Sequence, residues 1–328
     1  MSAEQAEHPP AEMVVGVATY ERGEAIKGTL ETIAALGTMG GRVRRAVIVD
    51  NGSRDEGAVI RRFIEQSRDC GGLTMEMVRE TTPGKSAALR RLFAETHEAY
   101  VAVTDDDCLL DAGWAEAMTR RLDAAERCGA VGGRMAPGWE SGPTRLALKY
   151  ARTLGAQDLG DKALLLADRG AFLGGACMAY RRAAVQDSGW LDAGMLDCRR
   201  GEAVEHGEDA ELCLRIRRAG WEVWYEPEAS LTHLVPADRQ TGRSLASMRE
   251  SIRRSEPILR WVASEGGLQR GEVEAELARA ERLHWKTLLT DWRPTRRAIR
   301  LGERRGWRDG WRRVRALMAD ASAAAPQD

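Results

Sequence analysis

The chain has 328 residues, which is enough for one large domain or two smaller ones. Its apolar fraction of 43% and its charged fraction of 30% are ordinary for a globular protein. The formal net charge of −1 gives no bulk attraction to a polyanion, so we expect no nucleic-acid partner.

The six cysteines are scattered and form no C-x-x-C pair, so zinc and thiol-redox motifs are not supported. Several, such as Cys177 and Cys213, lie in apolar contexts typical of small buried residues in a reducing compartment. Residues 1–12 are polar, and we expect them to be disordered. No stretch approaches the roughly 18–20 apolar residues that span a bilayer, and we expect a cytoplasmic protein.

Short apolar runs alternate with helical spacing over the first 135 residues. The expected strands are 14–18, 46–49, 73–78, 99–104 and 130–133. The expected helices between them are 24–36, 56–68, 85–97 and 115–127. Continuous apolar runs are typical of buried parallel strands, and repeated βα units predict a right-handed, doubly wound sheet.

The pattern weakens between 137 and 168, where we expect one helix at 144–154 within a loop region. Further strands are expected at 172–180, 221–225 and 230–233, and a helix at 208–219 that ends at Gly220. After Pro236 the chain is expected to be helical to its end. Breaks are expected at Gly266-Gly267, at Pro294 and between Gly302 and Gly310.

Polar clusters follow three of the expected strands: Thr19-Tyr20-Glu21, Asp50, and Asp105-Asp106-Asp107. Ligands of open α/β sheets bind beyond the carboxyl ends of the strands, so we expect the three clusters on one rim. No G-x-G-x-x-G or P-loop pattern is present, and nicotinamide-type and P-loop sites lose their main support.

The Asp105-Asp106-Asp107 triplet is the most informative of these clusters. Three adjacent carboxylates repel one another, and at the end of a strand they favour a bound cation. Mg²⁺ and Mn²⁺ take oxygen ligands, commonly one or two carboxylates together with substrate phosphates. The alternative is a solvated acidic turn, which the strand context disfavours.

Several segments follow one another in a characteristic order and spacing over roughly residues 12–236. These are VATYER (17–22), VDNGS (49–53), PGKSAA (83–88), DDD (105–107), FLGGACMAYRR (172–182), GEDAEL (207–212) and His233. In the order and spacing of these segments the chain resembles the family 2 glycosyltransferases of the GT-A fold, which are inverting, metal-dependent nucleotide-sugar transferases. Where the family commonly has an asparagine after the glycine-lysine segment, this chain has Arg90 or Arg91.

The resemblance implies an α/β, Rossmann-like GT-A fold with a mostly parallel central sheet flanked by helices. It implies a catalytic domain over 13–238, with a nucleotide-sugar-binding half at 13–135 and an acceptor-binding half at 136–238. We expect residues 239–328 to form a helical C-terminal extension. Acceptor choice is expected to depend on 137–168 and on residues past 240, which match no family segment.

The resemblance also implies roles for the metal ligands, with Mn²⁺ or Mg²⁺ as the cofactor. Asp107 is expected to contact the metal directly, and Asp105 to contact the ribose or complete the metal shell. Asp106 is expected to support the donor site. His233 is expected to complete the metal shell, and the alternative is a structural histidine.

Two acids are expected to carry the catalysis. Asp209 is the expected general base, with Glu208 orienting the acceptor or the loop. The alternative is that both acids only cap a helix N-terminus.

Five further residues are expected to bind the donor, each with turn or surface roles as the alternative. Asp50 is expected to accept a hydrogen bond from the nucleobase. The other expected contacts, to base, ribose and phosphate, come from Thr19, Tyr20, Glu21 and Lys85. Trp190 could stack on a sugar, although burial is the more frequent fate of tryptophan.

The C-terminal end is basic: residues 291–318 contain ten arginines and three acids. Trp292, Trp307 and Trp311 lie among these arginines. Interfacial helices combine basic residues with Trp, which would suit peripheral contact with the inner membrane face and a lipid-linked acceptor. The alternative is a helical cap on the catalytic domain, or on a second subunit in a homodimer.

The leading function is transfer of a sugar from a nucleotide-diphosphate sugar to a sugar, lipid-linked or small-molecule acceptor, in polysaccharide, glycolipid or glycoconjugate biosynthesis. A metal-dependent nucleotidyltransferase is the second enzyme interpretation. An inactive nucleotide-sugar-binding scaffold is the non-enzyme interpretation, which the acidic residues at 105–107 and 208–209 disfavour.

Overall fold

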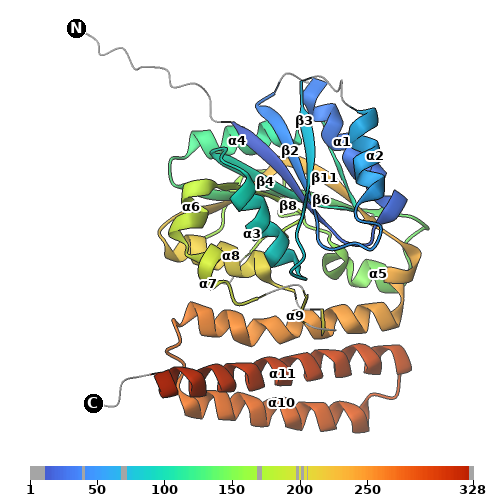
Figure 1. Cartoon of the computed structure of the whole chain (residues 1–328). Coiled ribbons are helices and arrows are strands. Elements are labelled where there is room, and N and C mark those ends of the chain that lie inside the picture. Colours follow the sequence, from blue (N-terminus) through green and yellow to red (C-terminus); the bar gives the residue numbers. More distant parts are fainter. Residues whose placement is uncertain are drawn as a thin grey trace.

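The computed structural model of the chain has an α/β body and a layer of C-terminal helices (Figure 1). It describes residues 12–38, 41–67, 72–167, 172–196, 199–200, 203–204 and 206–324. The expected disorder of the N-terminus concerns residues that lie, apart from Glu12, outside this range.

A nine-stranded mixed sheet forms the centre of the body, in the order β3-β2-β1-β4-β8-β6-β11-β5, with β7 also paired to β11. The first strands are β1 (Met13–Thr19), β2 (Val43–Asp50), β3 (Thr74–Arg79), β4 (Tyr100–Asp105) and β5 (Cys108–Leu110). The others are β6 (Cys128–Trp139), β7 (Leu164–Leu165), β8 (Cys177–Arg181) and β11 (Glu222–Val235). A separate pair consists of β9 (Arg199–Arg200) and β10 (Ala203–Val204).

The strands β3, β2, β1 and β4 pair in parallel, as the apolar runs predict. Successive side chains of a strand point to opposite faces, and here both faces are buried. Ala46 and Ile48 of β2 belong to one core, whereas Val47 and Val49 belong to the other. Beyond β4 the sheet is mixed, because β8 runs antiparallel to both of its neighbours.

Two sets of helices cover the faces of the sheet. One face is covered by η1 (Gly23–Ile26), α1 (Lys27–Thr38), α2 (Ala58–Gln66) and α4 (Trp114–Ala124). The other is covered by α3 (Lys85–Glu95), α6 (Arg182–Asp187), α7 (Trp190–Ala193) and α8 (Glu208–Arg218). Gly16 lets α3 approach β1 closely, since a Cβ there would lie 2.1 Å from Leu92 Cδ2.

Four strand predictions need correction. The strand expected at 130–133 is the first part of the longer β6, and those expected at 221–225 and 230–233 are one strand, β11. Its register with β6 shifts between Glu226 and Ser230, which accommodates Pro227 without ending the strand. The strand expected at 172–180 begins only at Cys177, after a turn at Gly175-Ala176.

No local pattern predicts β5, a short strand that directly follows the Asp triplet. It pairs antiparallel with β11, so that Cys108 lies opposite His233. The helix expected at 144–154 is divided into α5 (Arg145–Lys149) and η2 (Ala151–Leu154). Thr144 Oγ1 caps α5 by accepting a hydrogen bond from Ala147 N, at 3.0 Å.

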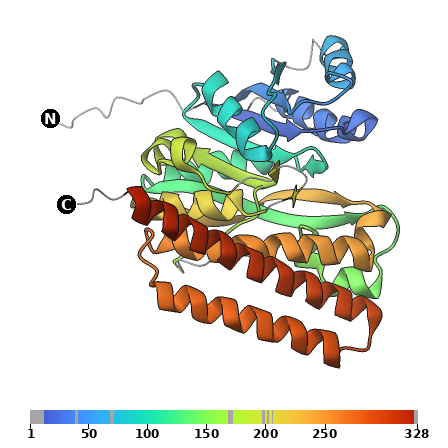
Figure 2. The same cartoon turned by 60° about the horizontal axis from the view of Figure 1, so that its bottom comes forward.

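The C-terminal helices form a layer beneath the sheet and its flanking helices (Figures 1 and 2). They are η3 (Ala237–Gln240), α9 (Gly242–Ala263), α10 (Arg270–Thr290) and α11 (Pro294–Ala324). The breaks expected at Gly266-Gly267 and at Pro294 are confirmed. The break expected between Gly302 and Gly310 is wrong, because α11 is continuous there.

Glycines at every fourth position let α11 lie directly on the backbone of α9. A Cβ would come within 2.6 Å of Ala246 O at Gly302, within 1.9 Å of Glu250 O at Gly306, and within 2.3 Å of Arg254 O at Gly310. Because the contacts advance in the same direction along both helices, α9 and α11 run parallel.

The tryptophans of the basic tail divide into two groups. Trp307 and Trp311 are buried in a core of the helical layer that also includes Ile258 of α9 and Leu196 of the body, whereas Trp292 is 81% exposed. Trp307 and Trp311 thus pack inside the protein, as the alternative of a helical cap on the catalytic domain requires, and Trp292 does not. No described helix is long and apolar enough to cross a membrane.

We predict that Gly306→Ala lowers the melting temperature. The added methyl group would overlap the Glu250 carbonyl, and overpacking typically costs about 1–3 kcal/mol. Gly271→Ala in α10 is the matched control, because its Cβ meets nothing within 4 Å and alanine favours a helix by about 1 kcal/mol. Equal melting temperatures for the two variants in thermal unfolding would contradict the close packing of α9 and α11.

Candidate functional site

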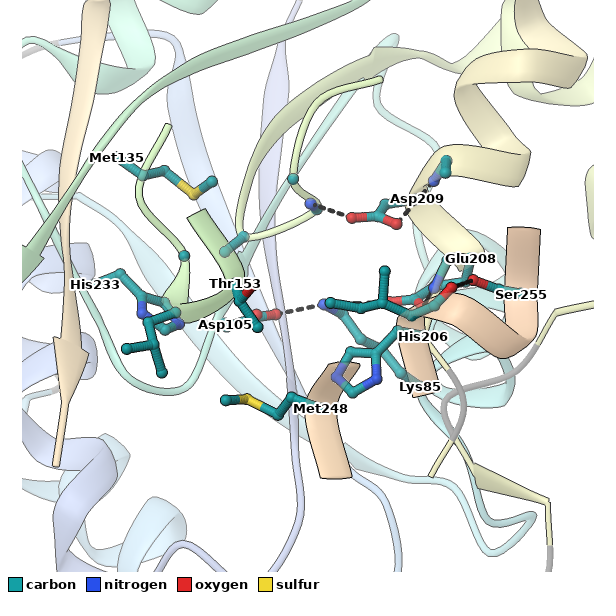
Figure 3. A pocket seen from close by; sticks show the side chains of 18 of the residues that line it. Lys85, Asp105, Met135, Thr153, His206, Glu208, Asp209, His233, Met248 and Ser255 are labelled. Atoms are coloured by element: carbon teal, nitrogen blue, oxygen red, sulfur yellow. Dashed lines mark hydrogen bonds and ion pairs between the residues drawn. The ribbon is translucent and has the colours of Figure 1, made fainter. Parts of the chain in front are cut away.

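A cavity of about 680 Å³ lies between the carboxyl ends of β1 and β4 and the helix α9 (Figure 3). Most of the predicted site residues line it: Thr19, Tyr20, Lys85, Asp105, Asp106, Asp107, Glu208, Asp209 and His233. Glu21 and Asp50 are not among the lining residues. The cavity therefore brings together residues, such as Thr19 and His233, that lie more than two hundred positions apart in the chain.

Asp107 and His233 form the part of the cavity that could hold a metal. The pairing of β5 with β11 brings them together, and His233 Nε2 lies 3.3 Å from Asp107 Oδ1. With Cys108 they make a buried group whose ligand atoms lie within 4.8 Å of one another. Asp105 is not part of this group, so its role as a metal ligand stays a prediction.

The donor set fits a hard or borderline cation better than a soft one. Burial, together with Asp105 and Asp107, raises the pKa of the Cys108 thiol well above its usual value, so the thiol stays protonated. A carboxylate oxygen and an imidazole nitrogen remain, which suit Mn²⁺. The other ring nitrogen, His233 Nδ1, is buried without a hydrogen-bond partner among the described residues.

Two arginines that the sequence did not single out balance the charge of the triplet. Arg22 Nε lies 2.8 Å from Asp106 Oδ1, and the same guanidinium also contacts Asp107. Arg239 Nη1 lies 3.4 Å from Asp107 Oδ2 and lines the cavity. Arg22 lies in the VATYER segment and Arg239 six residues after His233, but spacing alone does not reveal which arginine contacts a carboxylate.

Lys85 connects the two acidic clusters (Figure 3). Its Nζ lies 2.5 Å from Asp105 Oδ1 and 3.6 Å from Glu208 Oε1. Burial alone would raise the pKa of Asp105, but the Lys85 ammonium lowers it below its usual value. Lys85 is the first residue of α3 and follows Gly84, whose N–H donates to Asn51 Oδ1 at 2.8 Å.

Asp106 supports the loop after β1. Its Oδ2 accepts a hydrogen bond from Thr19 Oγ1 at 2.7 Å, and burial raises its pKa above the usual value. The two hydrogen-bonded residues fix the end of β1 against the end of β4. Both residues also line the cavity, and the supporting role expected for Asp106 stays a prediction.

Asp209 lies at the other end of the cavity, in the first turn of α8. Its Oδ2 accepts from Gly175 N at 2.8 Å and its Oδ1 from Ala210 N at 2.7 Å. Burial and the neighbouring Glu208 raise its pKa to about 6, while Lys85 and the two hydrogen bonds lower it. A carboxylate with such a pKa can accept a proton near neutral pH, which a residue that only caps a helix does not require.

The extension supplies one wall of the cavity, which the sequence did not reveal. Met248, Ile252, Ser255 and Leu259 of α9 line it, opposite the sheet. His206, a further lining residue, connects this wall to the body, because its Nδ1 lies 2.7 Å from Ser251 Oγ. Burial lowers the pKa of His206, which keeps its imidazole neutral.

Two predicted donor residues lie beside the cavity and not on its surface. Glu21 Oε1 accepts hydrogen bonds from Arg54 N and Nε, at 3.0 and 2.9 Å. Asp50 is fully buried, with Oδ1 accepting from Ser53 N at 3.2 Å. Asp50 Oδ2 lies 3.4 Å from Arg79 Nη1 and has no hydrogen bond among the described residues.

Trp190 is fully buried, so the possibility that it stacks on a sugar is wrong. The Arg90 guanidinium lies 5.1 Å from the centre of its ring and donates a hydrogen bond to Leu191 O. Arg90 therefore packs α3 against α7. The four cysteines that the structure describes are all buried and free, as expected.

Residues 9–262 match the family model described as "Glycosyltransferase like family 2". The fold is similar to that of the mannosyltransferase PcManGT from Pyrobaculum calidifontis in complex with GDP-Man and Mn²⁺, at 17% identity and a TM-score of 0.54 over 95% of this chain and 88% of that one. It is also similar to GalNAc-T7 with UDP, GalNAc and Mn²⁺, at 12% identity and a TM-score of 0.54 over 98% of this chain and 59% of that one. No curated protein matches the chain. The structural likenesses agree with the GT-A fold expected from the sequence.

We predict that Asp107→Ala and His233→Ala each weaken Mn²⁺ binding at least about tenfold, because each removes one side chain of the group that could hold the ion. Cys108→Ala should retain binding, since a protonated thiol is a poor ligand. Free Mn²⁺ can be measured by electron paramagnetic resonance, with and without a nucleoside diphosphate. Unchanged affinity in both ligand variants would rule out this site.

Proposed function

The chain belongs to the family described as Glycosyltransferase like family 2 and is a glycosyltransferase, and on this premise we propose that its cavity performs an inverting transfer. A sugar moves from a nucleotide-diphosphate sugar to an acceptor hydroxyl in a single displacement. The observation that carries the proposal is the position of Asp209. A carboxylate with a pKa of about 6 shares one cavity with the metal-capable pair Asp107 and His233. Figure 3 shows Asp209 and His233 on the wall of this cavity.

The donor diphosphate is proposed to bind at the Asp107 end of the cavity. Asp107 and His233 would hold Mn²⁺ or Mg²⁺, and the bound ion would supply positive charge to the departing diphosphate. Arg239, Arg22 and Lys85 bring three further cations to the same end. Both structurally similar transferases were solved with Mn²⁺ and a nucleotide or nucleotide sugar, which supports this choice of ligands.

The nucleoside is proposed to lie toward the ends of β1 and β2. Thr19 and Tyr20 line the cavity there and are proposed to contact the base or ribose, together with Glu21 behind them. Asp50 Oδ2 is a buried acceptor without a hydrogen bond among the described residues, which suits a donor group of the nucleobase. Asp105 is proposed to orient the ribose or the metal shell while ionised beside Lys85.

Asp209 is proposed to remove the proton of the acceptor hydroxyl as that oxygen attacks the sugar. Hydrogen bonds from Gly175 and Ala210 fix the carboxylate in position. Glu208 is proposed to position this segment through its contact with Lys85. One base and one attack from the face opposite the diphosphate lead to inversion at the sugar carbon.

The acceptor is proposed to enter between the sheet and α9. The lining residues there include Met248, Ile252 and Leu259 from α9, and Arg152 and Gln157 from the segment after α5. This wall is partly apolar, which is compatible with the sugar, lipid-linked and small-molecule acceptors considered above. We also propose that the protein acts in polysaccharide, glycolipid or glycoconjugate biosynthesis. A cytoplasmic location and a homodimer are further proposals.

A donor screen tests the proposal. The protein is incubated with UDP-, GDP- and dTDP-sugars and Mn²⁺, and the free nucleoside diphosphate is measured. Release that disappears in Asp107→Ala supports transfer or donor hydrolysis. Pyrophosphate release from a nucleoside triphosphate would support the nucleotidyltransferase, and donor binding without turnover would support the inactive scaffold.

We predict that Asp209→Asn keeps donor binding and lowers transfer by about 10²–10⁴-fold, because the amide cannot accept a proton. Donor binding is measured by calorimetry and transfer by the appearance of product, with the donor and acceptor from the screen. Asp192→Asn is the matched control, since Asp192 is exposed on α7 and does not line the cavity. Full activity of Asp209→Asn would refute the assignment of the base.

We predict that kcat rises about tenfold per pH unit below about pH 6 and levels off above it, because Asp209 must be deprotonated to act and its pKa is about 6. Glu208→Gln removes a negative neighbour that raises this pKa, so the inflection should move to lower pH. The measurement is kcat against pH for both proteins with saturating substrates. An inflection that stays in place in Glu208→Gln would contradict the coupling.

A further inference from the structure

Three large apolar side chains are exposed at the end of α10 and in the turn before α11. Trp285 is 64% exposed, Leu289 85% and Trp292 81%. The first two are four residues apart and therefore lie on one side of the helix. We call Trp285, Leu289 and Trp292 the turn patch. They differ from Trp307 and Trp311, which are buried in the helical layer.

The segment that carries the turn patch is strongly basic. Residues 282–300 contain six cations and one acid, whereas the whole chain has a net charge of −1. The cations are Arg282, Lys286, Arg293, Arg296, Arg297 and Arg300. The acid, Asp291, is buried and lies 3.4 Å from Arg296 and 3.2 Å from Arg300. Cations around exposed tryptophans are the combination that binds an anionic membrane interface.

We propose that the turn patch docks this protein on an anionic membrane surface. Trp285, Leu289 and Trp292 enter the interfacial region, where tryptophan finds both apolar and polar surroundings. The surrounding cations contact lipid phosphates, an attraction of about 1 kcal/mol for each basic residue near the surface. The protein thus lies on the membrane without crossing it.

The same end of the molecule offers a second contact. The helix α5 lies there in both views (Figures 1 and 2), and Ala147 of α5 shares a core with Ile299 of α11. Leu148 of α5 is 57% exposed, between the exposed cations Arg145 and Lys149. The helix α5 therefore presents the same combination as the turn patch, an exposed apolar side chain between cations.

A second copy of the chain fits the turn patch less well than a membrane does. Stable protein interfaces bury about 800 Å² on each partner, and three side chains at a helix turn supply only part of that area. Two copies joined through this patch would also bring two basic segments together, which like-charge repulsion opposes. Anionic lipid supplies the complementary charge and adapts its shape to a protruding turn.

The test is co-sedimentation with vesicles and does not depend on the proposed transfer reaction. Binding is measured to phosphatidylcholine alone and to an equal mixture of phosphatidylcholine and phosphatidylglycerol. We expect the full chain to bind only the anionic vesicles, and more weakly as salt is added. Trp285→Ser, Leu289→Ser and Trp292→Ser combined should lower the partition coefficient at least about tenfold.

Matched variants separate the patch from general effects. Leu159→Ser, Leu164→Ser and Leu165→Ser replace three leucines exposed elsewhere and should leave binding unchanged. Arg282→Glu with Lys286→Glu should weaken binding, whereas Arg44→Glu with Arg61→Glu, an equal charge change on exposed residues of the body, should not.

Three results would overturn the proposal. One is the absence of binding to anionic vesicles by the full chain. The second is equal binding by the turn-patch variant and its leucine control. The third is self-association of the full chain, measured by analytical ultracentrifugation, that only the turn-patch variant loses; this would assign the patch to a second copy.

Discussion

The arrangement of the site depends on the neutralisation of carboxylates that lie close together in one cavity. Two like charges about 4 Å apart repel by about 4 kcal/mol at the effective dielectric constant of a protein surface. Four of the acids here are paired with cations from three separate segments: Asp105 and Glu208 with Lys85, Asp106 with Arg22, and Asp107 with Arg22 and Arg239. The fold can bring these acids together because Arg22, Lys85 and Arg239, from three other segments of the chain, neutralise their charge.

The same distribution of charge separates two kinds of carboxylate. Asp105 lies against Lys85, and its pKa is lowered, so it stays ionised. Asp209 contacts backbone N–H groups and has Glu208 beside it, and its pKa rises to about 6. Ionised acids suit the binding of a metal and a nucleotide, whereas an acid with a pKa near neutrality suits proton transfer. The proposed division of labour between the two ends of the cavity follows from this difference.

The local sequence pattern predicts the strands and the acidic cluster that depend on neighbouring residues. It does not predict the features that depend on residues far away in the chain. The apolar runs of β1, β2 and β4 and the acidic cluster at 105–107 were recognised because their signals lie within a few residues. The short β5 was missed because only its pairing with β11 stabilises it, and that pairing brings His233 to Asp107. Arg22 and Arg239 were missed because no spacing marks an arginine as the partner of a carboxylate. The glycines of α11 were read as helix breakers, because the backbone of α9 that they pack against is more than fifty residues away.

The C-terminal layer contributes one wall of the candidate site through α9. One side of this helix lines the cavity with Met248, Ile252 and Leu259, and the other side receives the glycines of α11 at backbone distance. The position of α9 therefore depends on α11, and Trp307 and Trp311 of α11 share a buried core with Leu196 of the body. A change at the contact of the two helices would move the wall of the cavity that we assign to the acceptor, although it would leave the metal-capable pair on the sheet in place. Under the proposed assignment, stability of the layer and choice of acceptor are coupled through one helix, whereas binding of the donor depends on the sheet.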